Sequence, residues 1–125
     1  MPSIDDRLKK RVLWIGSDQE LVADARSVLP EGWQLNSGGS LGDFGEWQDI
    51  LLYRFLVLDL DAELAEDPVE IVDTVRREYQ INIPIFCYGG RPDQRAAARS
   101  AGADRFFERS EILLRLQDFV RQFGW

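Results

Sequence analysis

The chain has 125 residues, of which 45% are hydrophobic and 11% aromatic. This composition supports one packed domain and is too apolar for intrinsic disorder. Its 22 acidic and 15 basic residues give a net charge of -7, which disfavours binding to the phosphate backbone of nucleic acid. Histidine is absent and cysteine occurs once, so histidine-activated nucleophiles, internal disulfides and zinc knuckles are excluded.

The same features predict a cytoplasmic protein with no membrane contact. A lone cysteine fits a reducing compartment, and no apolar run approaches the roughly 20 residues of a membrane helix. The first six residues lack the apolar core of a signal peptide. We therefore expect residues 1–10 to form an N-terminal extension and residues 11–125 to form the folded domain.

Short apolar runs alternate with amphipathic stretches along the chain, beginning with a continuous apolar run at residues 12–15. Such a run is typical of a strand buried on both faces of a parallel sheet. A helix follows, and Asp18 or Ser17 can cap its first turn. Its apolar residues recur at helical spacing and predict one buried face: Leu21, Val22, Ala25, Val28 and Leu29.

Residues 33–36 predict a weaker second strand, and a glycine-rich loop separates it from a short helix expected at residues 43–52. The third strand is predicted at residues 55–58, where a second strongly apolar run ends in Asp59. The apolar residues of the short helix are expected to face inward: Phe44, Trp47, Ile50 and Leu51.

The next helix begins with Asp67 as cap and Pro68 at the first helical position, a common start signal. A fourth strand is predicted at residues 83–88. An alanine-rich helix follows at residues 92–101, and Gly102 marks its end.

The last strand is predicted at residues 104–107, and Ser110 is expected to cap the final helix. Five strand–helix units predict an α/β, flavodoxin-like fold, in which a parallel sheet of order 2-1-3-4-5 lies between two helical layers. The final helix has its apolar residues in a single stripe: Ile112, Leu113, Leu116, Phe119, Val120 and Phe123.

Ligands of such sheets bind beyond the carboxyl ends of the strands, which directs attention to the loops at residues 16–18, 59–63 and 88–91. Asp59 is the most informative residue, because a carboxylate at this edge can attack a phosphoryl group or hold a metal. The alternative is a structural role as a cap or a solvated strand end.

Three segments carry a resemblance to a known family. Residues 55–60 match a strand that ends in a phospho-accepting aspartate, residues 83–86 match a fourth strand led by proline, and residues 101–110 match an Ala-Gly-Ala-Asp-Asp-Tyr-Leu-x-Lys-Pro segment. The chain thus resembles the receiver (CheY-like) domain of bacterial two-component response regulators from residue 11 to about residue 123. The resemblance implies that Asp59 is the phospho-acceptor equivalent.

The chain departs from the family at the residues that hold magnesium. Gly16 and Ser17 occupy the positions of the family's acidic pair, and Asp18 lies just beyond them. Magnesium is commonly anchored by carboxylates, and only Asp18 and Asp59 remain as weak candidate ligands. We therefore expect no cofactor at this degenerate acidic pocket.

The chain also departs from the family where the phosphate would be contacted. Gly89 stands where the family has a threonine or serine hydroxyl, and Arg109 replaces the family's lysine. The proline that follows is replaced by Ser110, which predicts a trans peptide and leaves the direction of the Arg109 side chain open. Phe106 fills the aromatic switch position, but its partner hydroxyl is missing.

These departures predict a pseudo-receiver: a non-enzymatic signalling module of the two-component or phosphorelay type, without magnesium-dependent phosphorylation. Its expected partner is a histidine kinase, an output domain or another signalling protein. By resemblance, residues 93–124 form the contact face and can also mediate a homodimer. The candidate contact residues are Arg95, Arg99, Arg105, Arg115 and Arg121.

Two alternatives stay open. One is a working receiver that accepts a phosphoryl group on Asp59, with Ser17 and Asp18 supporting magnesium. The other is a flavodoxin-like domain that binds a small ligand, although no phosphate-binding glycine motif is present. Cys87 is interpreted as a core residue, whereas Trp125 can be an exposed aromatic end.

Overall fold

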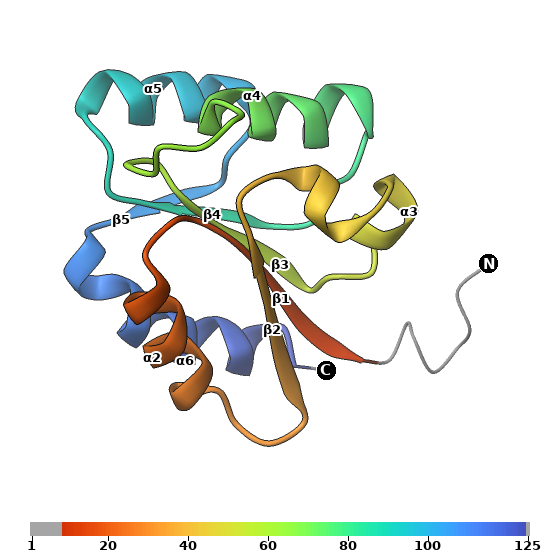
Figure 1. Cartoon of the computed structure of the whole chain (residues 1–125), viewed down its shortest axis with the longest axis vertical. Coiled ribbons are helices and arrows are strands. Elements are labelled where there is room, and N and C mark those ends of the chain that lie inside the picture. Colours follow the sequence, from red (N-terminus) through yellow and green to blue (C-terminus); the bar gives the residue numbers. More distant parts are fainter. Residues whose placement is uncertain (1–8, 125) are drawn as a thin grey trace.

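Five strands alternate with helices in the computed structural model, which describes residues 9–124 (Figure 1). All strand pairs are parallel and follow the order β2-β1-β3-β4-β5, as predicted. The predicted extension at residues 1–10 lies mostly outside the described residues, as does Trp125, and the first strand begins at Lys10. The strands are β1 (Lys10–Ile15), β2 (Trp33–Gly38), β3 (Phe55–Asp59), β4 (Ile85–Tyr88) and β5 (Arg105–Phe107).

Two helical layers cover the sheet. Helices α2 and α6 lie on one face, and α3, α4 and α5 lie on the other (Figure 1). Within residues 9–124, no helix is both long and apolar enough to cross a membrane. The helices are α2 (Gln19–Val28), α3 (Trp47–Ile50), α4 (Pro68–Asp73), α5 (Pro92–Ala101) and α6 (Ile112–Gln122). A π-helical segment, η2 (Thr74–Glu78), continues α4, and η1 (Leu41–Phe44) and η3 (Arg109–Glu111) are short 3-10 turns.

Each face of the sheet has its own hydrophobic core. The core beneath α2 and α6 is aromatic, and the rings of Phe86 and Phe119 stack with centroids 3.9 Å apart. The core beneath α3, α4 and α5 is mainly aliphatic. Successive residues of β1 alternate between the two, with Trp14 in the first and Leu13 in the second. Because the central strands are buried on both faces, their sequences are continuously apolar.

Most of the predicted helix ends are confirmed. The Asp18 carboxylate accepts a hydrogen bond from the Leu21 backbone N–H at 3.0 Å, and Asp67 caps α4 with Pro68 in its first turn. Helix α5 ends at Gly102, whose φ of 119° is left-handed. These caps fix where each helix leaves the strand edge.

The helix predicted at residues 43–52 is wrong. Gly45 has a φ of 100° and separates η1 from α3, which is a single turn. Ile50 is buried and Phe44 packs against the core as expected, but Trp47 and Leu51 are 46% and 50% exposed. The segment therefore forms two short turns, and each places one apolar side chain, Phe44 or Ile50, against the core.

The prediction that Ser110 caps the last helix is also wrong. Ser110 lies inside η3, where the Glu111 carboxylate accepts a hydrogen bond from the Glu108 N–H at 2.9 Å. Helix α6 then begins at Ile112, and its predicted apolar stripe is buried or partly buried. Strand β4 begins at Ile85, two residues later than predicted, because Pro84 has no N–H to donate.

Candidate functional site

The candidate site lies at the carboxyl ends of β1, β3 and β4. Asp59 is the last residue of β3 and pairs in register with Tyr88, the last residue of β4. It is 1% exposed and is the one buried charged residue in the described chain. The structure brings Gly16 and Arg109 to Asp59, and Asp18 to Arg109. The sequence indicated a common strand edge for Gly16, Asp18 and Asp59 and left the direction of Arg109 open.

Arg109 joins two carboxylates from different elements. One of its terminal nitrogens lies 3.5 Å from the Oδ2 atom of Asp59, and the other donates to the carboxylate of Asp18. The described residues contain no cis peptide, in agreement with the trans bond predicted before Ser110. The Arg109 side chain thus points into the site and occupies the space between the two candidate metal ligands.

Aromatic side chains close the other side of Asp59. The Trp14 indole Nε1 donates to the Tyr88 hydroxyl at 3.3 Å, and the two rings have centroids 5.6 Å apart. A β-carbon added at Gly16 would lie 3.1 Å from the Asp59 Cβ and 3.3 Å from the Tyr88 hydroxyl. At this position, where the resemblance places the family's first metal-binding acid, a side chain would therefore be tight and would require Asp59 or Tyr88 to shift by a few tenths of an ångström.

The two carboxylates have opposite electrostatic environments. Burial raises the pKa of Asp59, and the Asp61 backbone N–H, the Arg109 guanidinium and the Tyr88 hydroxyl oppose this effect in part. The Asp61 N–H lies 2.9 Å from the Asp59 carboxylate. In contrast, the Leu21 backbone N–H and then Arg109 lower the pKa of Asp18. The charge of Arg109 therefore compensates an Asp59 carboxylate that pays a desolvation cost.

The loop after β4 has no free side chain at the position of the family's hydroxyl. Gly89 has a φ of 71°, and the Asp61 carboxylate occupies the space where its β-carbon would lie. The Asp61 carboxylate accepts from the Gly90 N–H at 3.0 Å. The Arg95 Nε donates to the Gly89 carbonyl at 2.8 Å. Asp61 thus holds two loops together, and its carboxylate is directed at the backbone.

These residues do not fit a magnesium ion. Magnesium prefers an octahedral set of oxygen ligands anchored by carboxylates. Here Asp18 and Asp59 both take Arg109 as their cationic partner. In the described part of the chain, no group of three or more acidic or cysteine side chains is arranged to hold a metal.

Phe106, which the family resemblance places at an aromatic switch position, is held by a cationic side chain. Phe106 is partly buried against the core beneath α4 and α5, and the Arg99 guanidinium lies 4.7 Å from its ring centroid. This cation–π contact holds the ring from the helix side. Arg99 therefore serves as a partner for Phe106 in the same region where Gly89 offers no hydroxyl.

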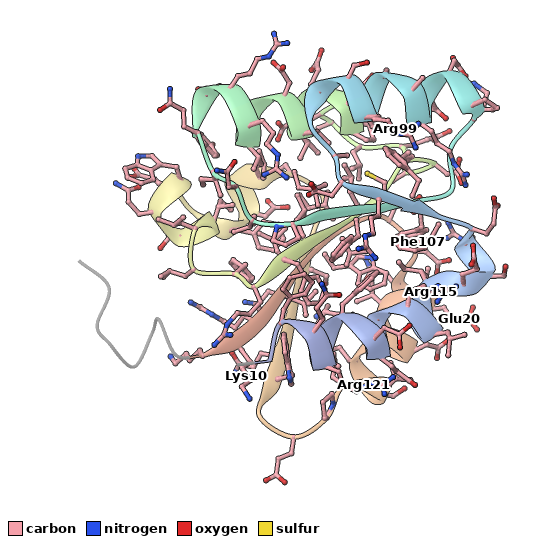
Figure 2. All side chains as sticks on the ribbon, turned by 180° about the vertical axis from the view of Figure 1, so that it is seen from behind. Lys10, Glu20, Arg99, Phe107, Arg115 and Arg121 are labelled. Carbon is pink, nitrogen blue, oxygen red and sulfur yellow. The ribbon has the colours of Figure 1, made fainter. Side chains whose placement is uncertain are left out.

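The predicted contact face is partly occupied by its own internal contacts. Arg95 donates to the Phe107 carbonyl and to Glu108, while Arg115 and Arg121 both pair with Asp118. Figure 2 shows Arg99 beside α5 and both Arg115 and Arg121 on α6. Leu114, on the same helix, is 62% exposed.

The sequence did not identify Tyr88 and Trp14 as parts of the site. The sequence directs attention to residues 88–91, which include Tyr88, but its candidate site residues include neither Tyr88 nor Trp14. A usable signal existed, because the final residues of adjacent parallel strands lie side by side once the strand order is known. In that register Tyr88 is the neighbour of Asp59.

Comparison with known proteins gives the fold. No family model and no curated protein matches the chain. A receiver domain of a response regulator from Bermanella marisrubri is 21% identical, with a TM-score of 0.74, over 94% of this chain and 99% of that one. The receiver domain of the TMAO respiratory system response regulator TorR is 16% identical, with a TM-score of 0.72, over 91% and 98%.

An orphan response regulator of H. pylori is also similar, at 18% identity and a TM-score of 0.67, over 90% of this chain and 97% of that one. Likeness along nearly the whole of both chains defines the class of fold. The chain has the CheY-like fold of response-regulator receiver domains, as predicted.

Proposed function

We propose that this chain is a receiver-like signalling module of a bacterial two-component or phosphorelay pathway, and that it acts in the cytoplasm through protein contacts. On this proposal it has no catalytic activity and does not use magnesium-dependent phosphorylation. The observation that carries the proposal is the Arg109 guanidinium bound between Asp18 and Asp59. This arrangement supplies internally the positive charge that a metal would otherwise bring.

Phosphoryl transfer to Asp59 would need an open and electropositive pocket. A transferred phosphoryl group carries negative charge that metal ions, cationic side chains and hydrogen-bond donors normally compensate. Here Tyr88 packs against one side of Asp59, and Arg109, the only cationic partner of Asp59 among the described residues, is already shared with Asp18. Asp61 adds a further negative charge at the same edge, which raises the cost of an incoming anion.

The partner on this proposal is a histidine kinase, an output domain or another signalling protein. Residues 93–124 are the first surface to test, and the same surface can support a homodimer. Leu114 is its most exposed large apolar residue. A Leu114→Glu variant should lose self-association in analytical ultracentrifugation if α6 forms the dimer contact, while its circular dichroism stays unchanged.

The decisive experiment is an amide NMR titration of the whole chain with magnesium and then with beryllofluoride, a mimic of the phosphoryl group. We expect no saturable shifts at Asp18, Asp59 and Gly89. The control is Asp59→Asn, which removes the acceptor carboxylate and should give the same spectrum of responses as the natural chain.

The opposite result has an equally clear meaning. Saturable shifts at Asp59 that spread to Phe106 and α6, and that disappear in Asp59→Asn, would establish a working phospho-accepting receiver. That alternative is favoured by one observation, the placement of Asp59 at the end of the central strand with a cationic side chain 3.5 Å away.

A further inference from the structure

An apolar pair is exposed at α3, where Trp47 is the first residue of the turn and Leu51 follows its last residue. The large exposed hydrophobic residues of the described chain are Trp47, Leu51 and Leu114. Two of these three belong to one segment, and their spacing of four residues places them on the same side of a helical turn. Ile50 of the same turn is fully buried, so the turn is anchored to the core while the pair faces outward.

Acidic side chains surround this pair. Between Gly39 and Tyr53 the chain has three acidic residues and no basic residue. We define the α3 patch by the exposed pair and these acids: Asp43, Glu46, Trp47, Asp49 and Leu51, all of which are exposed.

The backbone of the α3 patch is held in place by its own acids. The Asp43 carboxylate accepts from the Gly39 and Ser40 N–H groups at 2.9 and 3.2 Å. The Asp49 carboxylate accepts from the Glu46 N–H at 3.0 Å. A preorganised surface loses less conformational entropy when a partner binds than a flexible one would.

Two basic side chains near Tyr53 have contacts elsewhere in the domain. The guanidinium of Arg11 lies over the Tyr53 ring, 5.2 Å from its centroid. Arg54 donates to the Phe123 carbonyl at 3.1 Å. Both groups are thus directed toward the body of the domain.

The negative surface continues beyond the turn. A β-carbon at Gly39 would lie 3.8 Å from the Cδ2 atom of Leu64. The loop that follows β3 therefore approaches the loop that leads into η1. Residues 60–70 add five acidic residues and no basic residue.

From this juxtaposition we infer that the α3 patch binds a basic amphipathic helix of a partner protein. The apolar side of such a helix would cover Trp47 and Leu51, and its lysine or arginine residues would meet the acidic rim. Tryptophan is among the residues that contribute most to protein interfaces, and complementary charge favours fast association and discrimination between partners. Nucleic acid and anionic lipid carry the wrong charge for this rim.

This inference does not depend on whether Asp59 accepts a phosphoryl group. The α3 patch is a different segment from residues 93–124, and it belongs to the β2–β3 connection. It adds a second contact surface to the proposed signalling module and states the chemistry of its partner.

The test uses the whole chain and a synthetic helical peptide of leucine and lysine, roughly 18 residues or about five turns long. We expect saturable amide shifts at residues 43–52 on titration of the peptide. Trp47→Ala should weaken binding about tenfold or more. Because Trp47 is exposed, this variant should keep the fold. Added salt should also weaken binding, because it screens surface charge.

Two controls make the test specific. The same peptide with glutamate in place of every lysine should not bind. Leu114→Ala removes a comparably exposed apolar side chain from α6 and should leave the peptide affinity unchanged.

Several outcomes would overturn the inference. These are shifts centred on α6, equal binding by the Trp47→Ala variant, or binding of the glutamate peptide. Shifts at residues 43–52 that depend on protein concentration without any peptide would identify a second copy of the chain as the occupant. The proposed function would instead be contradicted by saturable shifts of Asp59 and Gly89 in the beryllofluoride titration. Those amides differ from the ones at residues 43–52 that report on the peptide.

Discussion

The Arg109 side chain neutralises two carboxylates whose surroundings differ. Asp59 is 1% exposed, whereas the Asp18 side chain is 33% exposed and also caps α2. Burial raises the pKa of Asp59, while the Leu21 N–H and Arg109 lower the pKa of Asp18. A raised carboxyl pKa means that ionisation opposes folding, and a lowered one means that ionisation favours it. Removing the charge should therefore raise the free energy of unfolding at Asp59 and lower it at Asp18.

We expect Asp59→Asn to raise the free energy of unfolding at pH 7 by an amount of order 1 kcal/mol. The asparagine keeps the shape and can still accept from the Asp61 N–H, while the desolvation cost of the buried charge disappears. The gain is full above the raised pKa of Asp59 in the folded state. The stability gain of Asp59→Asn decreases as the pH falls from that raised pKa to the ordinary aspartate pKa. Over this range the Asp59 carboxyl of the natural chain becomes protonated, so it too is uncharged. Urea denaturation at several pH values measures this difference.

Asp18→Asn is the matched variant at the other end of the same guanidinium. Asparagine still caps a helix, but its charge interaction with Arg109 is lost, so we expect lower stability at pH 7. This stabilisation exists above the ordinary aspartate pKa and disappears as the pH falls through the lowered pKa of the folded state. Equal signs for Asp18→Asn and Asp59→Asn would contradict the opposite environments described for the two carboxylates.

Introducing an acid beside Asp59 should destabilise the protein at position 16 and be tolerated at position 17. Gly16→Asp places a β-carbon against Asp59 and the Tyr88 hydroxyl, so we expect a loss of about 1–3 kcal/mol, the usual cost of overpacking. Ser17→Asp is the control, because Ser17 is exposed and surface changes usually stay within about 0.5 kcal/mol. Thermal unfolding of both variants tests this; a Gly16→Asp variant as stable as the natural chain would show that the pocket has room.

The sequence predicted which residues meet at this edge, but not how they contact one another. Asp59 and Asp18 follow from the ends of apolar strands and from helix capping, which are local patterns. The direction of the Arg109 side chain and the contact between Trp14 and Tyr88 depend on strand register and on rotamers, which are set by tertiary packing. Direct contacts across 50 residues, such as that between Asp59 and Arg109, have no local signal.

At the scale of helices and strands, chain reversals depend on a few glycines. Gly102 ends α5 with a φ of 119°, and a β-carbon there would lie 2.7 Å from the Arg76 side chain. Arg76 in turn donates to the Gly102 carbonyl at 2.9 Å and to the Ile81 carbonyl at 2.6 Å. The end of α5 is thus joined to the end of the preceding helical segment.

Gly102→Ala should destabilise the protein by roughly 1–2 kcal/mol, because alanine resists a left-handed backbone and would displace Arg76. Gly42→Ala is the matched control, since Gly42 has no positive φ and a β-carbon there would meet only the Ser40 Oγ, at an ordinary contact distance of 3.8 Å. Chemical denaturation should show little change for this control. A Gly102→Ala variant with unchanged stability would mean that the helix end adjusts without cost.

Glycine also explains where prediction of elements failed. Residues 43–52 have the apolar spacing of one helix, yet Gly45 adopts a φ of 100° and divides the segment. The Asp49 carboxylate then accepts from the Glu46 N–H and starts a new turn at Trp47. Hydrogen bonds from backbone N–H groups to acidic side chains replace those of a continuous helix. The spacing of apolar residues alone therefore gave the wrong prediction of one helix.

At the scale of the whole molecule, strand order could be predicted because its causes are general. Continuous apolar runs indicate buried parallel strands, and right-handed crossovers leave few possible orders. The division of the interior into an aromatic and an aliphatic core could not be predicted in the same way. It follows from which side of each strand faces α6, and a sequence specifies this only when the register is known.

Cys87 provides a probe of how this molecule opens as a whole. It lies in β4, between β3 and β5, and is completely buried. Burial raises the pKa of its thiol to about 12, whereas an unfolded cysteine has a pKa of about 8.5. Since the thiolate is the reactive species, modification at mildly alkaline pH requires exposure of the central sheet.

We therefore expect iodoacetamide to label Cys87 at least about a thousandfold more slowly in the native chain than in urea, since central strands open with nearly the full free energy of unfolding. If opening is global, Gly102→Ala should speed labelling and Asp59→Asn should slow it, each in proportion to its change in stability. If neither substitution changes the labelling rate, the opening that exposes Cys87 is local to β4 and β5. Mass spectrometry of the labelled fraction over time separates these outcomes, and it links the charge at Asp59 and the backbone at Gly102 to the cooperativity of the sheet.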